Sequence, residues 1–193
     1  MSEVKEAVAE NKDKAFLSVQ DICYIAVFTA LIAIMAQISI PLPAGVPFTL
    51  QTLAIPLAGI ILGAKRGTIA AVVYVLLGAV GVPVFAGFTG GPQTIVGYTG
   101  GFIVSFPLMA LTAGLVADKS IKNISFWAGL VAGAVLNYAI GTVWFMVVAK
   151  SGLAEAFFAC VVPFIPTAIV KIILAGIFGN TLRIALKKAS LIK

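Results

Sequence analysis

Charged residues are scarce in this sequence, and histidine is absent. Only 10% of the 193 residues are charged, whereas 61% are hydrophobic and the mean hydropathy is +1.14. A water-soluble domain cannot cover its surface with that composition, so the sequence predicts an integral membrane protein whose single membrane domain spans residues 1–193. The lack of histidine excludes histidine general-base chemistry and histidine-ligated metal sites.

Further absences exclude several classes of function. No GxxxxGK[ST] phosphate-binding loop is present, so the chain is not expected to hydrolyse ATP. None of the expected spans contains Asp or Glu, which removes paired carboxylates for proton coupling or for a metal. No nucleophile–base pair is evident either, so we predict neither an enzyme nor a bound cofactor or metal. The two cysteines, Cys23 and Cys160, are expected at opposite membrane faces, where they cannot form a disulfide.

Long apolar runs between charged turns predict six transmembrane helices in an all-α fold. The expected spans are about 22–40, 49–63, 68–81, 98–117, 126–149 and 157–182. Almost all Lys and Arg residues fall in the inner segments of this layout, and the outer loops hold only Lys150. The positive-inside rule therefore places both termini in the cytoplasm. Topology also accounts for the net charge of +6, so no nucleic-acid partner is inferred.

The first 20 residues are polar and of mixed charge, which predicts a cytoplasmic segment rather than a signal peptide. Ser18 and Asp21 have the spacing of a helix capping box. An uncharged stretch, rich in glycine, joins the third and fourth spans at about 82–97. Its composition fits a lid over a small-molecule site, and it also fits an ordinary, poorly ordered connection.

Lys171 is the sharpest single feature, because it is the only cation inside an apolar span. A charge at the centre of a span costs roughly 2.5–3.5 kcal/mol, so we expect the side chain to face the bundle interior. With no carboxylate in any span, its partner is expected to be an anionic ligand such as a carboxylate. The alternative is that the side chain extends to a membrane surface.

A second candidate position is Asn137, near the middle of the fifth span. Gly133, Gly141 and Trp144 share its helical face, which combines an amide, space and an aromatic wall. This face suits a ligand, although an interhelical hydrogen bond is a common alternative role for Asn in membranes.

Further candidates lie near the outer loops. Gln51 and Tyr98 offer polar groups to a ligand or to water, while Phe85 and Trp144 could pack on a ring or serve only as packing residues. On the first span, Ala26, Ala30 and Ala33 form a face of small residues that permits close approach of another helix. Routine packing within the bundle is the alternative for that face.

Two motifs resemble those of the BioY family, the biotin-capturing S components of energy-coupling-factor (ECF) transporters. The sequence PFTLQTL at 47–53 resembles the motif after the family's first span. The sequence LGAVGVPVFAG at 77–87, followed by TGGF at 99–102, resembles the family's third-loop signature. The resemblance extends over essentially the whole chain in length and number of spans.

This resemblance implies a six-helix S-component fold in the cell membrane of a prokaryote, with a biotin site near the outer surface under the first and third loops. The expected ligand-binding residues are Lys171, Asn137, Gln51, Tyr98, Phe85, Thr99 and Trp144. The implied partners are a transmembrane coupling protein, which would contact Ala26, Ala30 and Ala33, and two cytoplasmic ATPases.

Three other functions are open at this point. An S component for another vitamin would share the fold. A solitary facilitator or channel would need a continuous polar path through the spans, and the sequence offers few intramembrane polar groups. A membrane enzyme would need Lys171 as its base, because no histidine is available.

Overall fold

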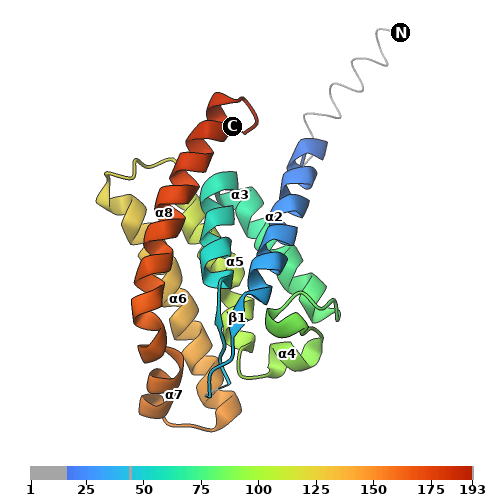
Figure 1. Cartoon of the computed structure of the whole chain (residues 1–193), viewed down its shortest axis with the longest axis vertical. Helices are drawn as coiled ribbons and strands as arrows, with labels where there is room; N and C mark the ends of the chain where they lie inside the picture. Colours follow the sequence, from blue (N-terminus) through green and yellow to red (C-terminus); the bar gives the residue numbers. More distant parts are fainter. Residues whose placement is uncertain (1–16, 44, 193) are drawn as a thin grey trace.

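The computed structural model describes residues 17–43 and 45–192, so most of the expected polar segment 1–20 lies outside the described residues. Six helical segments pack side by side as an elongated bundle (Figure 1). The segments are α2 (Val19–Gln37), the two limbs of α3 (Gln51–Ala79), α5 (Gly100–Leu115), α6 (Ile124–Ala149) and α8 (Ile165–Lys188). The expected all-α architecture with six helices is therefore confirmed.

Helix α2 begins with the capping box predicted from the sequence. The Ser18 hydroxyl accepts a hydrogen bond from the Asp21 N–H at 3.1 Å, and the Asp21 carboxylate accepts one from the Ser18 N–H at 3.0 Å. These bonds satisfy N–H groups that have no partner within the helix, which fixes its start. After α2, strand β1 (Ser39–Ile40) pairs antiparallel with β2 (Phe48–Thr49).

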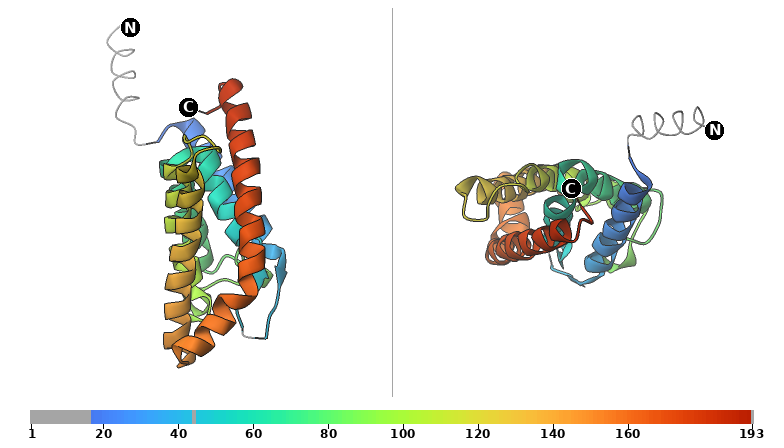
Figure 2. Two further views of the ribbon diagram at one scale, coloured as in Figure 1. Left: turned by 90° about the vertical axis from the view of Figure 1, so that its left-hand side faces the viewer. Right: turned by 90° about the horizontal axis from the view of Figure 1, so that it is seen from above.

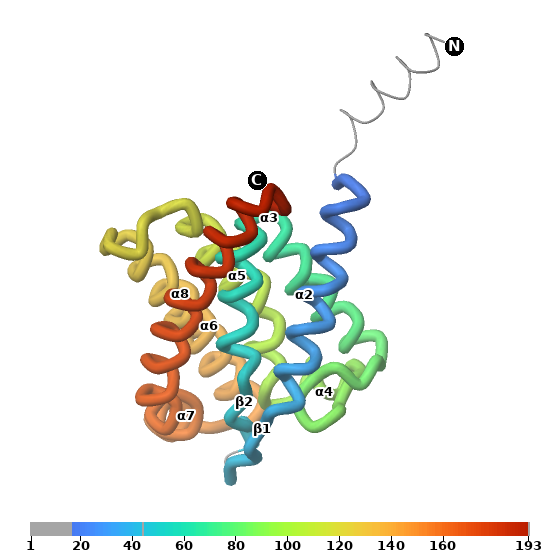
Figure 3. Tube along the Cα trace, turned by 45° about the horizontal axis from the view of Figure 1, so that its top comes forward, coloured from blue at the N-terminus to red at the C-terminus, as the bar shows by residue number. Residues whose placement is uncertain are grey.

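Helix α3 is folded back on itself at Gly63. This residue has φ 82° and ψ 172°, a conformation that only glycine adopts readily. The first limb, 51–62, and the second limb, 64–79, lie side by side. A hydrogen bond of 2.7 Å from Gln51 Nε2 to the Tyr74 hydroxyl joins them. On a straight helix these residues would be about 34 Å apart. The two limbs are visible as separate tubes in Figure 3.

The short elements gather at one end of the bundle, which we call the hairpin end. They are the β1–β2 hairpin, η1 (Ala86–Phe88), α4 (Pro92–Val96), α7 (Leu153–Cys160) and η2 (Val162–Phe164). The start of α2 and the end of α8 lie at the opposite end, which we call the terminal end (Figures 1 and 2). The hairpin end therefore carries most of the non-helical chain that can enclose a site.

Several boundaries differ from those expected. The turn expected at Lys65 and Arg66 falls at Gly63, because its backbone breaks the helix and both charged residues are already helical. The uncharged stretch 82–97 contains α4 as well as loop. The expected span 157–182 is interrupted after Cys160 by η2, which holds Pro163, and α8 then continues to Lys188.

The outer surface of the bundle is apolar, as a bilayer requires. Large hydrophobic side chains are exposed along α2, α6 and α8, including Val27, Val135 and Ile169. Four segments are long and apolar enough to cross a membrane: α2, α3, α6 and the continuous stretch Leu153–Lys188. One of these four segments, α3, is a hairpin of two limbs, so the number of apolar segments is not the number of times the chain crosses the membrane.

Candidate functional site

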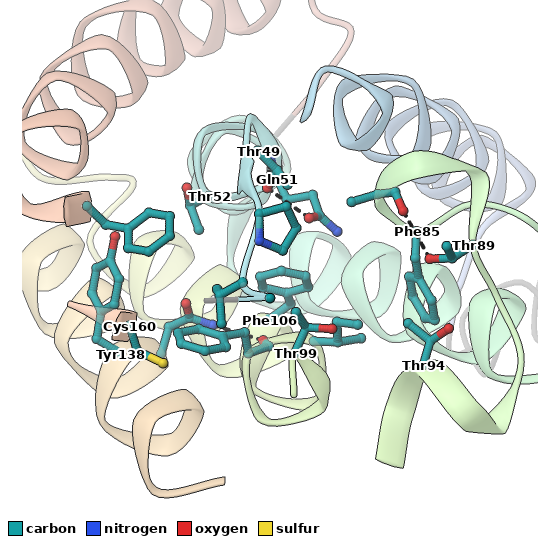
Figure 4. A pocket seen from close by; sticks show the side chains of 18 of the residues that line it. Thr49, Gln51, Thr52, Phe85, Thr89, Thr94, Thr99, Phe106, Tyr138 and Cys160 are labelled. Atoms are coloured by element: carbon teal, nitrogen blue, oxygen red, sulfur yellow. Dashed lines mark hydrogen bonds between the residues drawn. The ribbon is translucent and has the colours of Figure 1, made fainter. Parts of the chain in front are cut away.

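The hairpin end encloses a cavity of about 280 Å³. This volume is close to the lower end of the range typical of small-molecule sites, about 300–1,000 Å³. Residues of the β1–β2 connection, the segment 85–99 and helices α3, α5, α6, α7 and α8 line it. In Figure 4 the cavity extends from Tyr138 and Cys160 at one end to Phe85, Thr89 and Thr94 at the other. A site built from so many elements depends on the tertiary fold rather than on one motif.

Lys171 lies inside the bundle, on the cavity wall, and its side chain does not extend to the outer surface of the bundle. It is 6% exposed, and its Nζ donates to the Thr49 carbonyl at 2.6 Å and to the Thr52 hydroxyl at 3.0 Å. The same atom is 4.0 Å from the centroid of the Phe48 ring, a cation–π distance. Among the described residues that line the cavity, Lys171 alone is charged. The cavity therefore favours a ligand with an anionic or strongly accepting group.

Gln51 connects the start of α3 with its second limb. Its Oε1 accepts from the Thr49 hydroxyl at 2.8 Å, and its Nε2 donates to the Tyr74 hydroxyl at 2.7 Å. Tyr74 in turn donates to the Val84 carbonyl at 3.1 Å. Gln51 lines the cavity and is 5% exposed, so it contributes both to the wall and to the network that holds the wall in place.

Asn137 also lines the cavity and is 1% exposed. Its Nδ2 donates to the Phe102 carbonyl at 2.9 Å and to the Ser105 hydroxyl at 2.8 Å. The interhelical hydrogen bond considered from the sequence is therefore present. Its Oδ1 is buried and has no hydrogen-bond partner. Because a buried acceptor without a partner costs about 1–3 kcal/mol, a ligand N–H group at this position would recover that free energy.

Phe85 fixes the uncharged segment against α3. It is 1% exposed, lines the cavity and packs edge-on against Tyr74, with ring centroids 5.5 Å apart. A Cβ atom on Gly78 would lie only 2.0 Å from Phe85 Cζ, so glycine is required for this contact. Gln37 adds bonds from α2 by donating to the Phe85 carbonyl at 3.2 Å and accepting from the Phe88 N–H at 2.8 Å. The segment is therefore well anchored, as a cover over a site would be.

The other expected ligand residues fall into two groups. Thr99 precedes α5 and lines the cavity. Tyr98 and Trp144 do not line it. The Tyr98 ring packs against Phe145, with centroids 5.5 Å apart, and Trp144 Nε1 donates to the Gly97 carbonyl at 2.9 Å. The structure thus brings together Lys171, Asn137, Gln51, Phe85 and Thr99, and places the other two aromatic residues behind the wall.

Several lining residues were not predicted from the sequence. Thr52, Thr89 and Thr94 supply hydroxyl groups, and Tyr138 and Cys160 form the far end of the cavity. Tyr138 had no clear signal, because successive helix residues do not face the same way and its neighbour Asn137 does not fix its direction. The threonines had none, since a single Thr in an apolar run is common and only the fold decides which way it points.

The small-residue face of α2 lies outside the cavity. Ala26 and Ala30 are exposed, whereas Ala33 is half-buried and packs against the core. Two of the three alanines are therefore free to contact another helix.

Comparison with known proteins gives a consistent result. The BioY family model matches residues 8–188. The biotin transporter BioY of Thermotoga maritima is 42% identical over 157 residues, which cover 81% of this chain and 92% of that protein. The probable biotin transporter BioY of Pyrococcus horikoshii is 38% identical, with 86% and 98% covered.

A solved structure agrees with the fold. The crystal structure at 2.1 Å of the S-component for biotin from an ECF-type ABC transporter aligns with a TM-score of 0.77 and 28% identity. The alignment covers 86% of this chain and 91% of that one. Because the family model takes in nearly the whole chain and the architecture agrees, this protein belongs to the BioY family.

Proposed function

We propose that this chain is the biotin-binding membrane subunit of an ECF-type vitamin uptake transporter. The observation that carries the proposal is the cavity, in which Lys171 is the sole charged lining residue described and Asn137 Oδ1 is an acceptor without a partner. The named relatives are biotin transporters, and the aligned crystal structure is that of a biotin S-component. The chemistry of the cavity and the resemblance therefore support the same ligand.

Biotin carries a carboxylate, a ureido group and an apolar bicycle, and the cavity offers a counterpart for each. Lys171 Nζ pairs with the carboxylate, since no acidic residue is described in the cavity wall to neutralise this cation. Asn137 Oδ1 accepts from a ureido N–H. Phe85, Phe102 and Phe106 supply apolar surface for the bicycle. An apolar site with a few polar anchors is well suited to tight capture.

We further propose that the hairpin end faces outward and the terminal end faces the cytoplasm of a prokaryotic cell. The subunit would then take biotin from outside and deliver it inward with a transmembrane coupling protein and two cytoplasmic ATPases. Ala26 and Ala30, exposed on α2, are the proposed contact for the coupling protein.

The alternatives have less support. A solitary facilitator needs a polar path to the terminal end, whereas Ile60, Ala113 and Phe126 form a buried apolar cluster there. An S component for another vitamin would keep the fold and change the cavity wall, so ligand binding has to separate the two.

Isothermal titration of the purified, biotin-depleted protein tests the proposal. Biotin should bind tightly at one site in the wild type, and Lys171→Met should weaken binding by about 10–100-fold, because a charge-assisted hydrogen bond is worth about 1.5–3 kcal/mol. Lys150→Met is the matched control, since Lys150 caps α6 outside the cavity. No binding by a well-folded wild type would disprove the biotin assignment.

Biotin methyl ester shows which end of the ligand meets Lys171. If Nζ pairs with the carboxylate, the wild type should bind the ester more weakly than biotin. Lys171→Met should bind the ester and biotin about equally well. If the wild type binds ester and acid alike while Lys171→Met still loses affinity, Lys171 instead donates to the ureido oxygen.

A further inference from the structure

The part of the uncharged stretch nearest the ligand cavity is a small closed loop, residues 85–89, which we call the cover loop. The Phe85 N–H donates to the Thr89 carbonyl at 3.0 Å, and the two residues form an isolated antiparallel bridge. Phe85, Ala86 and Thr89 line the cavity, and Figure 4 shows the first and last of them at one end of it. Displacement of this one loop would therefore open the cavity at that end.

The cover loop has a backbone conformation that its own sequence does not favour. Phe88 has φ 56°, in the left-handed region that residues other than glycine rarely adopt, bulky residues least of all. Its side chain is exposed, so packing of the ring does little to offset this strain. The loop therefore depends on contacts with other elements to keep its shape.

Gln37, the last residue of α2, supplies such contacts. Its Nε2 donates to the carbonyls of Val84 and Phe85, each at 3.2 Å, and its Oε1 accepts from the Phe88 N–H at 2.8 Å. Nε2 also donates to the Ala33 carbonyl at 3.0 Å, which holds the amide against its own helix. A single uncharged amide thus binds the loop backbone with both its donor and its acceptor.

The same contacts join the cover loop to the cavity wall. The Val84 carbonyl also accepts from the Tyr74 hydroxyl at 3.1 Å, and that hydroxyl accepts from Gln51 Nε2. Gln51 lines the cavity, whereas Gln37 does not. Gln37 therefore acts on a ligand through the position of the loop and not by direct contact.

We propose that Gln37 is a positioning residue that holds the cover loop closed against α2, and that breaking its bonds to the loop is the step that opens the cavity. The closed loop is then one of two states, and the Gln37 amide sets how often the open one is visited. This opening does not depend on which ligand the cavity takes. That biotin enters and leaves by it rests on the proposed function.

The reactivity of Cys160 measures opening without a ligand. This buried cysteine lines the cavity, and in a Cys23→Ala background, the parent for these tests, it is the only thiol of the chain. Methyl methanethiosulfonate, a small neutral reagent, should label it in purified protein at least tenfold faster in Gln37→Met than in the parent, because the labelling rate follows the open population. Tenfold corresponds to about 1.4 kcal/mol, which one or two net hydrogen bonds can contribute.

Gln93→Met is the matched control. Gln93 lies in the same uncharged stretch and outside the cavity lining, and its Nε2 donates to the Gly90 carbonyl within that stretch. Its labelling rate should stay within about twofold of the parent. Gln37→Ala is the second test variant, because it leaves room for water beside the freed backbone groups. It should accelerate labelling as Gln37→Met does.

Equal labelling rates in the parent and both Gln37 variants would overturn the proposal, as would equal acceleration in Gln93→Met. Thermal unfolding is measured beside labelling. A purely structural role for Gln37 would lower the melting temperature and leave the labelling rate of the folded protein unchanged, and that result would overturn the proposal too.

Biotin separates this inference from the proposed function. Saturating biotin should slow the labelling of Cys160 in the parent. Gln37→Met should speed both the uptake and the release of radiolabelled biotin about tenfold and change Kd less than threefold, because the bonds that break do not involve the ligand.

Faster labelling of Gln37→Met with no protection by biotin in the parent would contradict the proposed function and leave Gln37 as the residue that holds the loop. Faster labelling with protection, but with unchanged biotin exchange, would mean that the ligand passes by another route. The role of the cover loop in ligand exchange would then be wrong.

Discussion

Asn137 shows how one side chain can serve the fold and the ligand at once. Its Nδ2 group is fully used by the Phe102 carbonyl and the Ser105 hydroxyl, which ties α6 to α5. Its Oδ1 is buried without a partner, in a residue that lines the cavity. Since buried polar groups are nearly always paired, the free acceptor marks the atom that the ligand is expected to meet.

Asn137→Leu should weaken biotin binding by about tenfold or more, because a ligand N–H would face an apolar side chain instead of an acceptor. Isothermal titration measures this loss. Ser105→Ala is the control, since it removes one partner of Nδ2 and keeps Oδ1. Equal losses of affinity in the two variants would mean that Asn137 acts only through the packing of α5 on α6.

At this scale the sequence is most informative where a polar or charged residue is rare in its surroundings. Lys171 and Asn137 stand out in apolar spans, and both line the cavity. Tyr98 and Trp144 lie outside the cavity, where they pack against Phe145 and bind the Gly97 carbonyl, respectively. The sequence does not show this, because an aromatic residue near a loop can pack either on a ligand or on the protein itself. The orientation of Thr94 is likewise decided by tertiary structure.

At the scale of elements, α8 braces the first limb of α3 at both ends. Lys171 binds Thr49 and Thr52 at the hairpin end of that limb. At the other end, Arg183 Nη1 donates to the carbonyls of Ile60 and Ile61, at 3.0 and 2.9 Å, just before the break at Gly63. The last carbonyls of a helix have no partner within it, so Arg183, which binds two carbonyls just before the break, acts as a cap supplied by another helix.

Arg183 is held in turn by Asp118, whose carboxylate accepts from Nη2 at 2.8 Å and from Lys187 Nζ at 2.8 Å. Hydrogen bonds from Lys187 and Arg183 lower the pKa of Asp118 to about 2. The Asp118 side chain is 72% exposed, so this ion pair is screened by water and contributes little. The buried bonds to Ile60 and Ile61 carry the stabilisation.

Arg183→Met should therefore lower the free energy of unfolding by about 2–3 kcal/mol, which corresponds to roughly 5–10 °C in melting temperature. Thermal unfolding in detergent measures the change. Lys187→Met should shift the melting temperature by less than a quarter as much, because among the described residues this partly exposed side chain bonds only to Asp118. Similar shifts in both variants would show that the ion pair, and not the cap, stabilises the break.

Prediction from the sequence is good for the number of helices and weaker for their ends. Lys65 and Arg66 correctly suggest a turn between two spans, but the chain reverses at Gly63 because backbone conformation, and not charge, sets the break. The interruption after Cys160 was not foreseen, since Pro163 is compatible with a helix start as well as with a break. In each case the hydrophobic pattern locates the element and local backbone chemistry sets its boundary.

At the scale of the whole molecule, charge is distributed unequally between the two ends of the bundle. Described cations at the terminal end include Arg66, Lys119, Lys122, Arg183, Lys187 and Lys188. At the hairpin end, Lys150 follows α6. The start of α2 and the end of α8 share the basic end (Figure 2). From the positive-inside rule we expect the basic end to lie in the cytoplasm and the ligand cavity to face outward.

Cysteine labelling in intact cells tests this orientation. In a background with Cys23→Ala and Cys160→Ala, we expect Lys150→Cys to react with a membrane-impermeant maleimide, because the hairpin end faces outward. Lys188→Cys should react only after the cells are permeabilised. Both positions are exposed, so the comparison reports sidedness and not burial. The reverse pattern would place the cavity on the cytoplasmic side, where the cavity could not capture biotin from outside, and uptake would need another explanation.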